Sequence, residues 1–97
     1  MSTTKKNLQI KHDLIGKIFF LKAKGGNAEL HYERHGDSYL DLISTTVPAE
    51  SRGFGIGTLL IEEALEFAAA QHLKVKPTCV FVNQYITKHS EYHYLLV

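Results

Sequence analysis

The stretch VPAESRGFGIGTLLIEEAL, which runs from Val47 to Leu65, decides the fold because three different patterns meet in it. A strand-like run ends at Val47, and a helix-like run begins at Gly57. Between them, Gly53, Gly55 and Gly57 stand within five residues. Glycine has no Cβ atom and tolerates positive φ, so this spacing indicates a junction at which the backbone must come close to another group.

The segment 57–71 has the period of an amphipathic helix. Leu60, Ala64 and Phe67 recur at helical spacing, and the glutamates of the segment take the other side. This segment gives the clearest helix signal in the chain.

The segments before the glycines alternate between apolar and polar residues, as strands do. Four strands are predicted, over 8–12, 16–23, 28–36 and 39–47. In the last of them the alternation places Ser44 on the same face as Leu40 and Leu42. Short turns between these runs favour an antiparallel meander.

A further strand is predicted over 73–82, interrupted or bent by Pro77, which cannot donate to a strand ladder. A short helix and one or two further helical turns are expected over 83–97, with Asn83 either as the helix N-cap or as a ligand contact. A meander followed by one β-α-β crossover indicates an α+β fold.

Length and composition limit the classes of protein. The 97 residues fit a single domain over 1–97, with the polar residues 1–7 frayed. A net charge of +1 and the lack of a long apolar run favour neither nucleic-acid nor membrane partners. A single cysteine and no signal-peptide pattern favour a cytoplasmic protein, and the six histidines show no metal-ligand spacing.

A glycine-rich loop ahead of a helix is a natural phosphate site. The first turn of a helix has unpaired N–H groups and a partial positive charge, and Arg52 adds a cation suited to phosphate oxygens. The spacing is not that of a P-loop, because no lysine follows Gly57. It is not that of a dinucleotide fingerprint either, because Thr58 stands where the third glycine belongs.

The loop Arg52-Gly53-Phe54-Gly55-Ile56-Gly57 resembles the Arg/Gln-x-x-Gly-x-Gly/Ala pyrophosphate loop of GNAT-type N-acetyltransferases. The later stretch KVKPTCVFVNQYITKHSEY is similar to the strand and tail of the very short NATD1-like subfamily. The resemblance implies a mixed, mostly antiparallel sheet that splays open between the strand ending at Val47 and the strand around Cys79.

The resemblance also implies that acetyl-CoA lies in this splay, with no metal. Its pantetheine arm would pair with backbone near 43–47, and its pyrophosphate would rest on the N–H groups of 53–58. The cofactor-binding residues so implied are Val47, Arg52, Gly53, Phe54, Gly55, Ile56, Gly57, Thr58, Asn83 and Lys88.

Two residues are candidates for the chemistry at the thioester. Cys79 would face the cleft, either as a nucleophile or as part of the pocket wall, and Tyr85 is a candidate proton donor to the leaving thiolate. Many short relatives have His-Thr-Glu-Val where this chain has Ser44-Thr45-Thr46-Val47, so a carboxylate base is missing from that strand. The alternatives stay open: His31, His35 or Glu33 as base, or an amine that arrives already deprotonated.

These features bear on three functions from different classes. The first is acetyl-CoA-dependent N-acetyl transfer to a small-molecule or peptide amine. The second is a CoA-binding module with little or no catalysis, which the missing histidine and glutamate favour. The third, an RNA-binding module, is disfavoured by the near-zero net charge. The acceptor cannot be read from the sequence, and a homodimer is left open.

Overall fold

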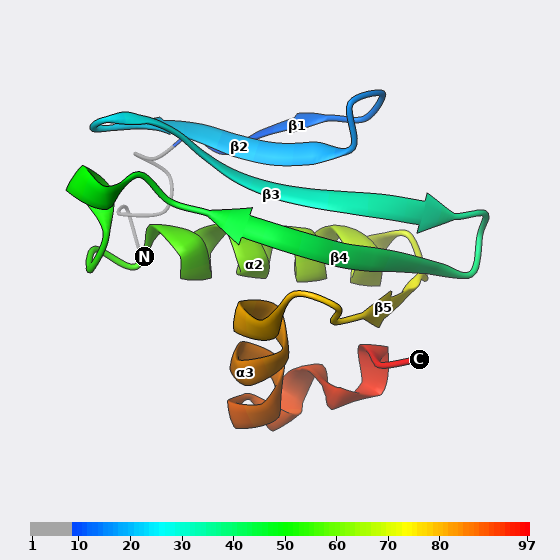
Figure 1. The fold of residues 1–97 in the computed structure, drawn as a ribbon. Helices are drawn as coiled ribbons and strands as arrows, with labels where there is room; N and C mark the ends of the chain where they lie inside the picture. The colour runs from blue at the N-terminus through cyan, green and yellow to red at the C-terminus, as the bar shows by residue number, and fades with distance from the viewer. Residues whose placement is uncertain (1–8) are drawn as a thin grey trace.

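The computed structural model describes residues 9–97, in which helices lie against one mixed sheet (Figure 1). The elements are β1 Lys11–Asp13, β2 Ile18–Ala23, β3 Gly26–His35, β4 Tyr39–Thr46, the 3-10 helix η1 Ala49–Ser51, α2 Ile56–Ala70, β5 Lys74–Lys76, α3 Val80–Lys88 and the 3-10 helix η2 Ser90–Leu95. The frayed segment predicted over 1–7 lies outside the described residues.

The sheet has the strand order β1-β2-β3-β4-β5. The first four strands pair antiparallel in chain order, and β5 pairs parallel to β4. A parallel pair cannot be joined by a hairpin, so α2 carries the chain across as the crossover of a β-α-β unit. The predicted α+β fold, with a mixed and mostly antiparallel sheet, is confirmed.

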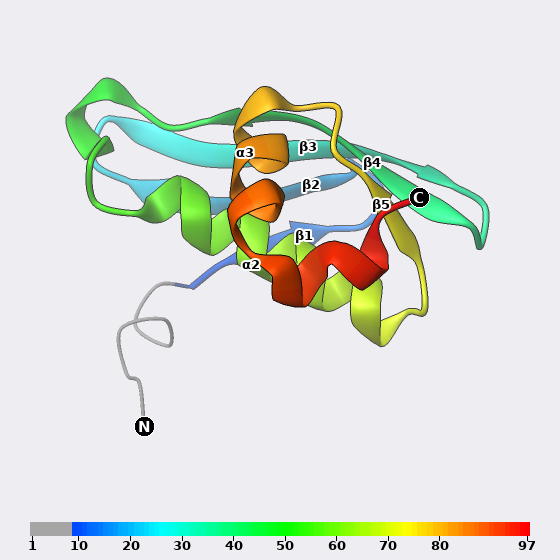
Figure 2. The same cartoon turned by 90° about the horizontal axis from the view of Figure 1, so that it is seen from below.

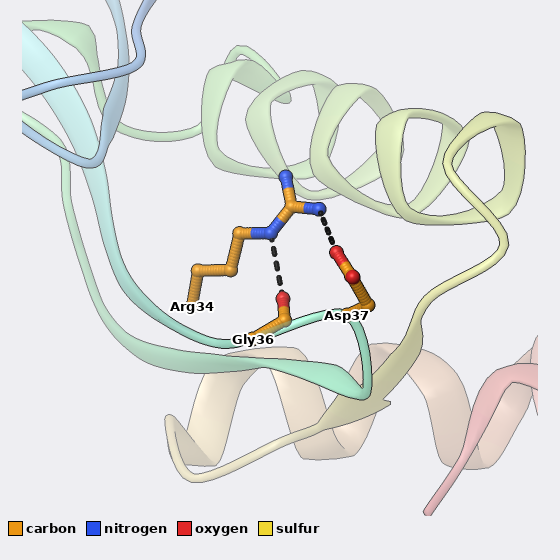
Figure 3. A network of polar contacts seen from close by, with 3 residues as sticks. All are labelled: Arg34, Gly36 and Asp37. Carbon is orange, nitrogen blue, oxygen red and sulfur yellow. Dashed lines mark hydrogen bonds and ion pairs between the residues drawn. The ribbon is translucent and has the colours of Figure 1, made fainter.

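The turn between β3 and β4 is held by one arginine side chain (Figure 3). Arg34 Nε donates to the carbonyl oxygen of Gly36 at 2.8 Å, and Arg34 Nη2 lies 3.3 Å from Asp37 Oδ1. Gly36 has a φ of +58°, in the left-handed region that glycine enters without steric strain. This turn lies far along the sheet from the glycine-rich loop, at the opposite end of β4 (Figure 1).

α2, α3 and η2 lie on one side of the sheet (Figure 2). On that side the buried residues of α2 pack against alternate residues of the strands, among them Phe19, Leu21, Leu30 and Tyr32. The intervening residues point to the other side, which no described helix covers. We call that side the open face, and it carries Ile18, Phe20 and Lys22 of β2 and Glu29, His31 and Glu33 of β3.

A β-bulge in β4 changes the face on which Ser44 lies. Leu42 stands opposite Tyr32, but the next residue of β3, His31, stands opposite Ser44, so Ile43 is the extra residue. Ser44 therefore joins His31 on the open face. The prediction that Ser44 shares the face of Leu40 and Leu42 is wrong, because alternation assumes an uninterrupted ladder.

The strand predicted over 73–82 is also mostly wrong. The strand ends at Lys76, and α3 begins at Val80 with Cys79 as its N-cap. Pro77 has no N–H group for the ladder, and the apolar run that follows suits a helix as well as a strand, with Val82 buried.

The helix found in place of the predicted strand decides two further predictions. Asn83 is not the N-cap, because it lies inside α3, where its N–H group donates to Cys79 O at 2.9 Å. The helical turns expected in the tail are present as α3 and η2. Within residues 9–97, no helix combines the length and apolarity needed to cross a bilayer.

Candidate functional site

The sheet opens where β4 and the chain after β5 diverge. The parallel pairing ends at Asp41 and Lys76, and the Thr78 hydroxyl donates to the Asp41 carboxylate just beyond it. Cys79 N–H then donates to Leu42 O at 2.8 Å. Past that bond, no backbone hydrogen bond among the described residues joins 43–46 to the segment after β5. The predicted opening is present, but its far wall is the first turn of α3 rather than a strand.

A cavity of about 510 Å³ lies between the end of β4, the start of α2 and α3. It is lined by Thr45, Thr46, Val47, Arg52, Gly53, Gly55, Ile56, Gly57, Thr58 and Phe81. Seven of the ten residues predicted to contact a cofactor are in this set. The glycine-rich loop and the strand end, distant from each other in sequence, thus form one continuous lining.

The glycine-rich loop presents unpaired backbone donors to this cavity. Gly55 is the N-cap of α2, with a φ of +76°, and Gly53 has a φ of +87°. The N–H groups of Gly55, Ile56 and Thr58 make no hydrogen bond to the described backbone, because the helical ladder starts with Leu59 N–H to Gly55 O. No acidic side chain lies in the first turn of α2 to neutralise its positive end.

Gly57 has a different role from the other two glycines. A Cβ atom added there would lie 2.6 Å from Phe81 Cε2, so the missing side chain lets α3 come close to α2. Phe81 also lines the cavity. The sequence did not predict this contact, because the pattern over 73–82 indicates a strand. The recurrence of Phe81 with Val82, Tyr85 and Ile86 at helical spacing was the available signal.

Arg52 is anchored by one nitrogen and presents the others. Its Nε donates to Val47 O at 3.1 Å, which fixes the side chain beside the loop. No carboxylate of residues 9–97 pairs with its guanidinium. The remaining donors can therefore serve an anion in the cavity.

Three predicted contacts lie outside the cavity lining. Phe54 is 75% exposed and is not a lining residue. Asn83 caps no helix, and its carbonyl oxygen accepts from the Thr87 hydroxyl. Lys88 lines a separate hollow of about 150 Å³ with Phe81, Gln84, Tyr85 and His89. Phe81 borders both hollows, so Lys88 lies beyond this ring rather than in the main cavity.

Cys79 lies at the inner end of the opening. Its Sγ is 3.6 Å from Thr45 Oγ1, and Thr45 lines the cavity. The thiol is half-buried and packs against the core. This position is next to the cavity, yet it leaves both proposed roles of Cys79, nucleophile and wall, as predictions.

Tyr85 does not line the cavity. Its hydroxyl donates to Glu62 Oε2 at 2.7 Å, and its ring stacks on His89. Burial and the hydrogen bond to the Glu62 carboxylate raise the pKa of Tyr85 well above 10.0. Both observations disfavour Tyr85 as the donor of a proton to a thiolate and favour a role in joining α3 to α2.

The raised pKa of Tyr85 predicts a loss of stability at alkaline pH. The folded protein keeps the tyrosine proton where the unfolded chain releases it, so the stabilisation is complete below pH 10.0 and falls as pH rises above it. Urea unfolding measured from neutral pH to above 10.0 should show this fall. Tyr85→Phe should reduce the fall in the free energy of unfolding with pH. Tyr94 is 62% exposed, so Tyr94→Phe should leave that fall unchanged. Identical slopes for the wild type and Tyr85→Phe would contradict the assignment.

Comparisons with known proteins show the family of this chain. The profile of the GCN5-related N-acetyl-transferase family matches residues 18–95. Protein NATD1 of Gallus gallus is 33% identical over 90 residues, which cover 91% of this chain and 82% of the relative. Protein NATD1 of Homo sapiens is 32% identical over 90 residues, with 91% and 80% covered.

A solved structure has the same fold. The NMR solution structure of a GCN5-like protein from Staphylococcus aureus superposes with a TM-score of 0.73, covering 94% of this chain and 89% of that one at 24% identity. The family profile spans both the glycine-rich loop and α3, the two segments that enclose the cavity. The chain therefore belongs to the GCN5-related N-acetyltransferase family.

Proposed function

We propose that the protein transfers an acetyl group from acetyl-CoA to an amine. The observation that carries this proposal is the cavity of about 510 Å³ in which unpaired N–H groups at the start of α2, Arg52 and the open edge of β4 meet. A pyrophosphate can accept hydrogen bonds from the N–H groups and from Arg52. An extended amide-bearing arm can pair with the edge of β4, because an unpaired strand edge offers backbone donors and acceptors.

The residues present fit acetyl-CoA on structural grounds. Gly53 and Gly55 leave nothing within 4 Å of the positions where a Cβ would stand, so a phosphate can approach the backbone. Bound there, acetyl-CoA supplies an activated thioester. The protein supplies orientation, and free N–H groups of the β4 edge can donate to the oxyanion that develops on the carbonyl oxygen.

A CoA-binding module without catalysis is the second candidate. Two observations favour it: Ser44 and Thr46 supply no carboxylate or imidazole on β4, and the Tyr85 hydroxyl is occupied by Glu62. The two candidates share the binding site and differ only in thioester consumption. Release of free thiol from acetyl-CoA in the presence of an amine therefore separates them.

A titration with CoA tests the binding site common to both candidates. In ¹⁵N-labelled protein, the amide signals of Gly53, Gly55, Gly57 and Thr58 should shift most, because these groups lie nearest the expected pyrophosphate. The amides of the β3–β4 turn, at the other end of the sheet, serve as the internal control. Large shifts elsewhere with the loop unmoved would show that CoA binds at another place.

A further inference from the structure

On the open face, a histidine and a carboxylate form a pair beside the β4 bulge. His31 Nε2 lies 2.9 Å from Glu29 Oε1. In the register, His31 stands opposite Ser44 and Glu29 stands opposite Thr46. Thr46 lines the cavity, and Ser44 comes two residues before it, so the backbone of β3 at this pair lies one strand spacing, about 4.8 Å, from the end of β4.

We propose that His31 is the base that takes the proton from the acceptor amine, with Glu29 as the residue that positions it. This inference rests on the proposed acetyl transfer and assigns a step of it. An amine that reaches the opening across the open face meets His31 beside the bulged residues of β4. The two side chains are 48% and 35% exposed, so they are accessible on that face.

The contact with Glu29 determines which ring nitrogen is basic. An ionised carboxylate only accepts hydrogen bonds, so Nε2 of His31 carries the proton when the imidazole is neutral. The lone pair is then on Nδ1. This is the arrangement in which a carboxylate holds a histidine in one tautomer and stabilises the imidazolium that forms on proton uptake.

The proton balance of the step is complete. An ammonium group gives one proton to His31 Nδ1, and the neutral nitrogen attacks the thioester carbonyl carbon. The new C–N bond forms as the C–S bond breaks, and the thiolate takes the second nitrogen proton to become free CoA. The imidazolium then returns its proton to solvent, so the net products are the amide, CoA and one proton.

The other carboxylate and imidazole groups near this pair on the open face are less suited to this step. Glu33 is paired with Lys17 at 3.0 Å. His35 stacks on Tyr39 at the far end of β3, with ring centroids 4.4 Å apart. Asp41, opposite Glu33, accepts from Thr78. Only the His31–Glu29 pair of the described open face lies beside the bulge.

The remaining histidines of the described chain lie elsewhere. His12 is on the helix-covered side against Phe19, where burial lowers its pKa. His89 and His93 contact backbone carbonyl oxygens of α3. His72 follows the end of α2, away from the cavity.

Two probe amines separate this step from acetyl transfer as a whole. Hydroxylamine is largely unprotonated at neutral pH and needs no base, whereas n-propylamine is an ammonium ion and needs one. We expect His31→Asn to lower the rate of thiol release with n-propylamine by about 10²-fold or more, the usual contribution of a general base. The rate with hydroxylamine should stay close to that of the wild type. His35→Asn, on the same strand and face, should change neither rate.

The outcomes distinguish the two proposals. If His31→Asn keeps the wild-type rate with n-propylamine, or loses both rates equally, His31 is not the base. If the wild type consumes acetyl-CoA with neither amine, the acetyl-transfer proposal is overturned and this inference falls with it.

A second readout does not depend on activity. The ¹⁵N shifts of the His31 ring in the wild type should show the tautomer with Nε2 protonated, and Glu29→Gln should lose that preference, because an amide can donate as well as accept. The CoA titration should be unchanged in His31→Asn and in Glu29→Gln. A wild-type ring protonated on Nδ1 would overturn the proposal.

Discussion

Replacing Gly55 by valine is expected to weaken CoA binding by about 10²-fold. The added side chain would stand where a phosphate approaches the N–H groups at the start of α2, and charge-assisted hydrogen bonds of about 1.5–3 kcal/mol each would be lost. Gly55 also has a φ of +76°, so valine would strain the loop by about 1–3 kcal/mol. Because small domains have about 5–15 kcal/mol of stability, the variant should still fold.

The strain and the steric block can be separated by a matched variant. Gly36 in the β3–β4 turn has a φ of +58°, and, as at Gly55, no atom lies within 4 Å of its Cβ position. Gly36→Val should therefore lower the thermal midpoint to a similar extent and leave the CoA affinity unchanged. Affinity by titration and the thermal midpoint are measured in the same buffer. Equal CoA affinity in Gly55→Val and the wild type would refute the phosphate cradle.

The largest loss of folding stability is expected from Leu60→Ala. Leu60 lies in α2 with no exposed surface, against the strands of the sheet. Removing a fully buried leucine side chain leaves a cavity and destabilises a protein by about 2–5 kcal/mol. The free energy of unfolding from urea denaturation measures this loss.

The same chemical change at an exposed site is the control. Leu14, in the turn between β1 and β2, is 62% exposed, so Leu14→Ala should change stability by less than about 0.5 kcal/mol. Similar losses for the two variants would mean that Leu60 does not pack in the core as described.

The sequence by itself predicted the parts of the fold that local pattern controls. Alternation predicted the strands of the meander, and the 3.6-residue period predicted α2, because each pattern extends over enough residues to define one face. The glycines between Arg52 and Thr58 predicted most of the cavity lining, since their conformational freedom and the helix start act within a few adjacent residues.

Other features depended on contacts that local pattern does not record. The apolar run after Pro77 fits a strand or a helix equally well. Packing on α2 and the hydrogen bond from Cys79 N–H to Leu42 O favour the helix. That choice placed Phe81 in the cavity lining and turned Tyr85 toward Glu62.

The base candidate is the clearest case of a feature that only the tertiary structure decided. The sequence left His31, His35 and Glu33 equal, because alternation puts all three on one face of one strand. The bulge at Ile43 set the register that brings Ser44 opposite His31, and Lys17 and Tyr39 engage the other two. A bulge and cross-strand pairs join residues that are distant in sequence, so their positions follow from the assembled sheet rather than from any one strand.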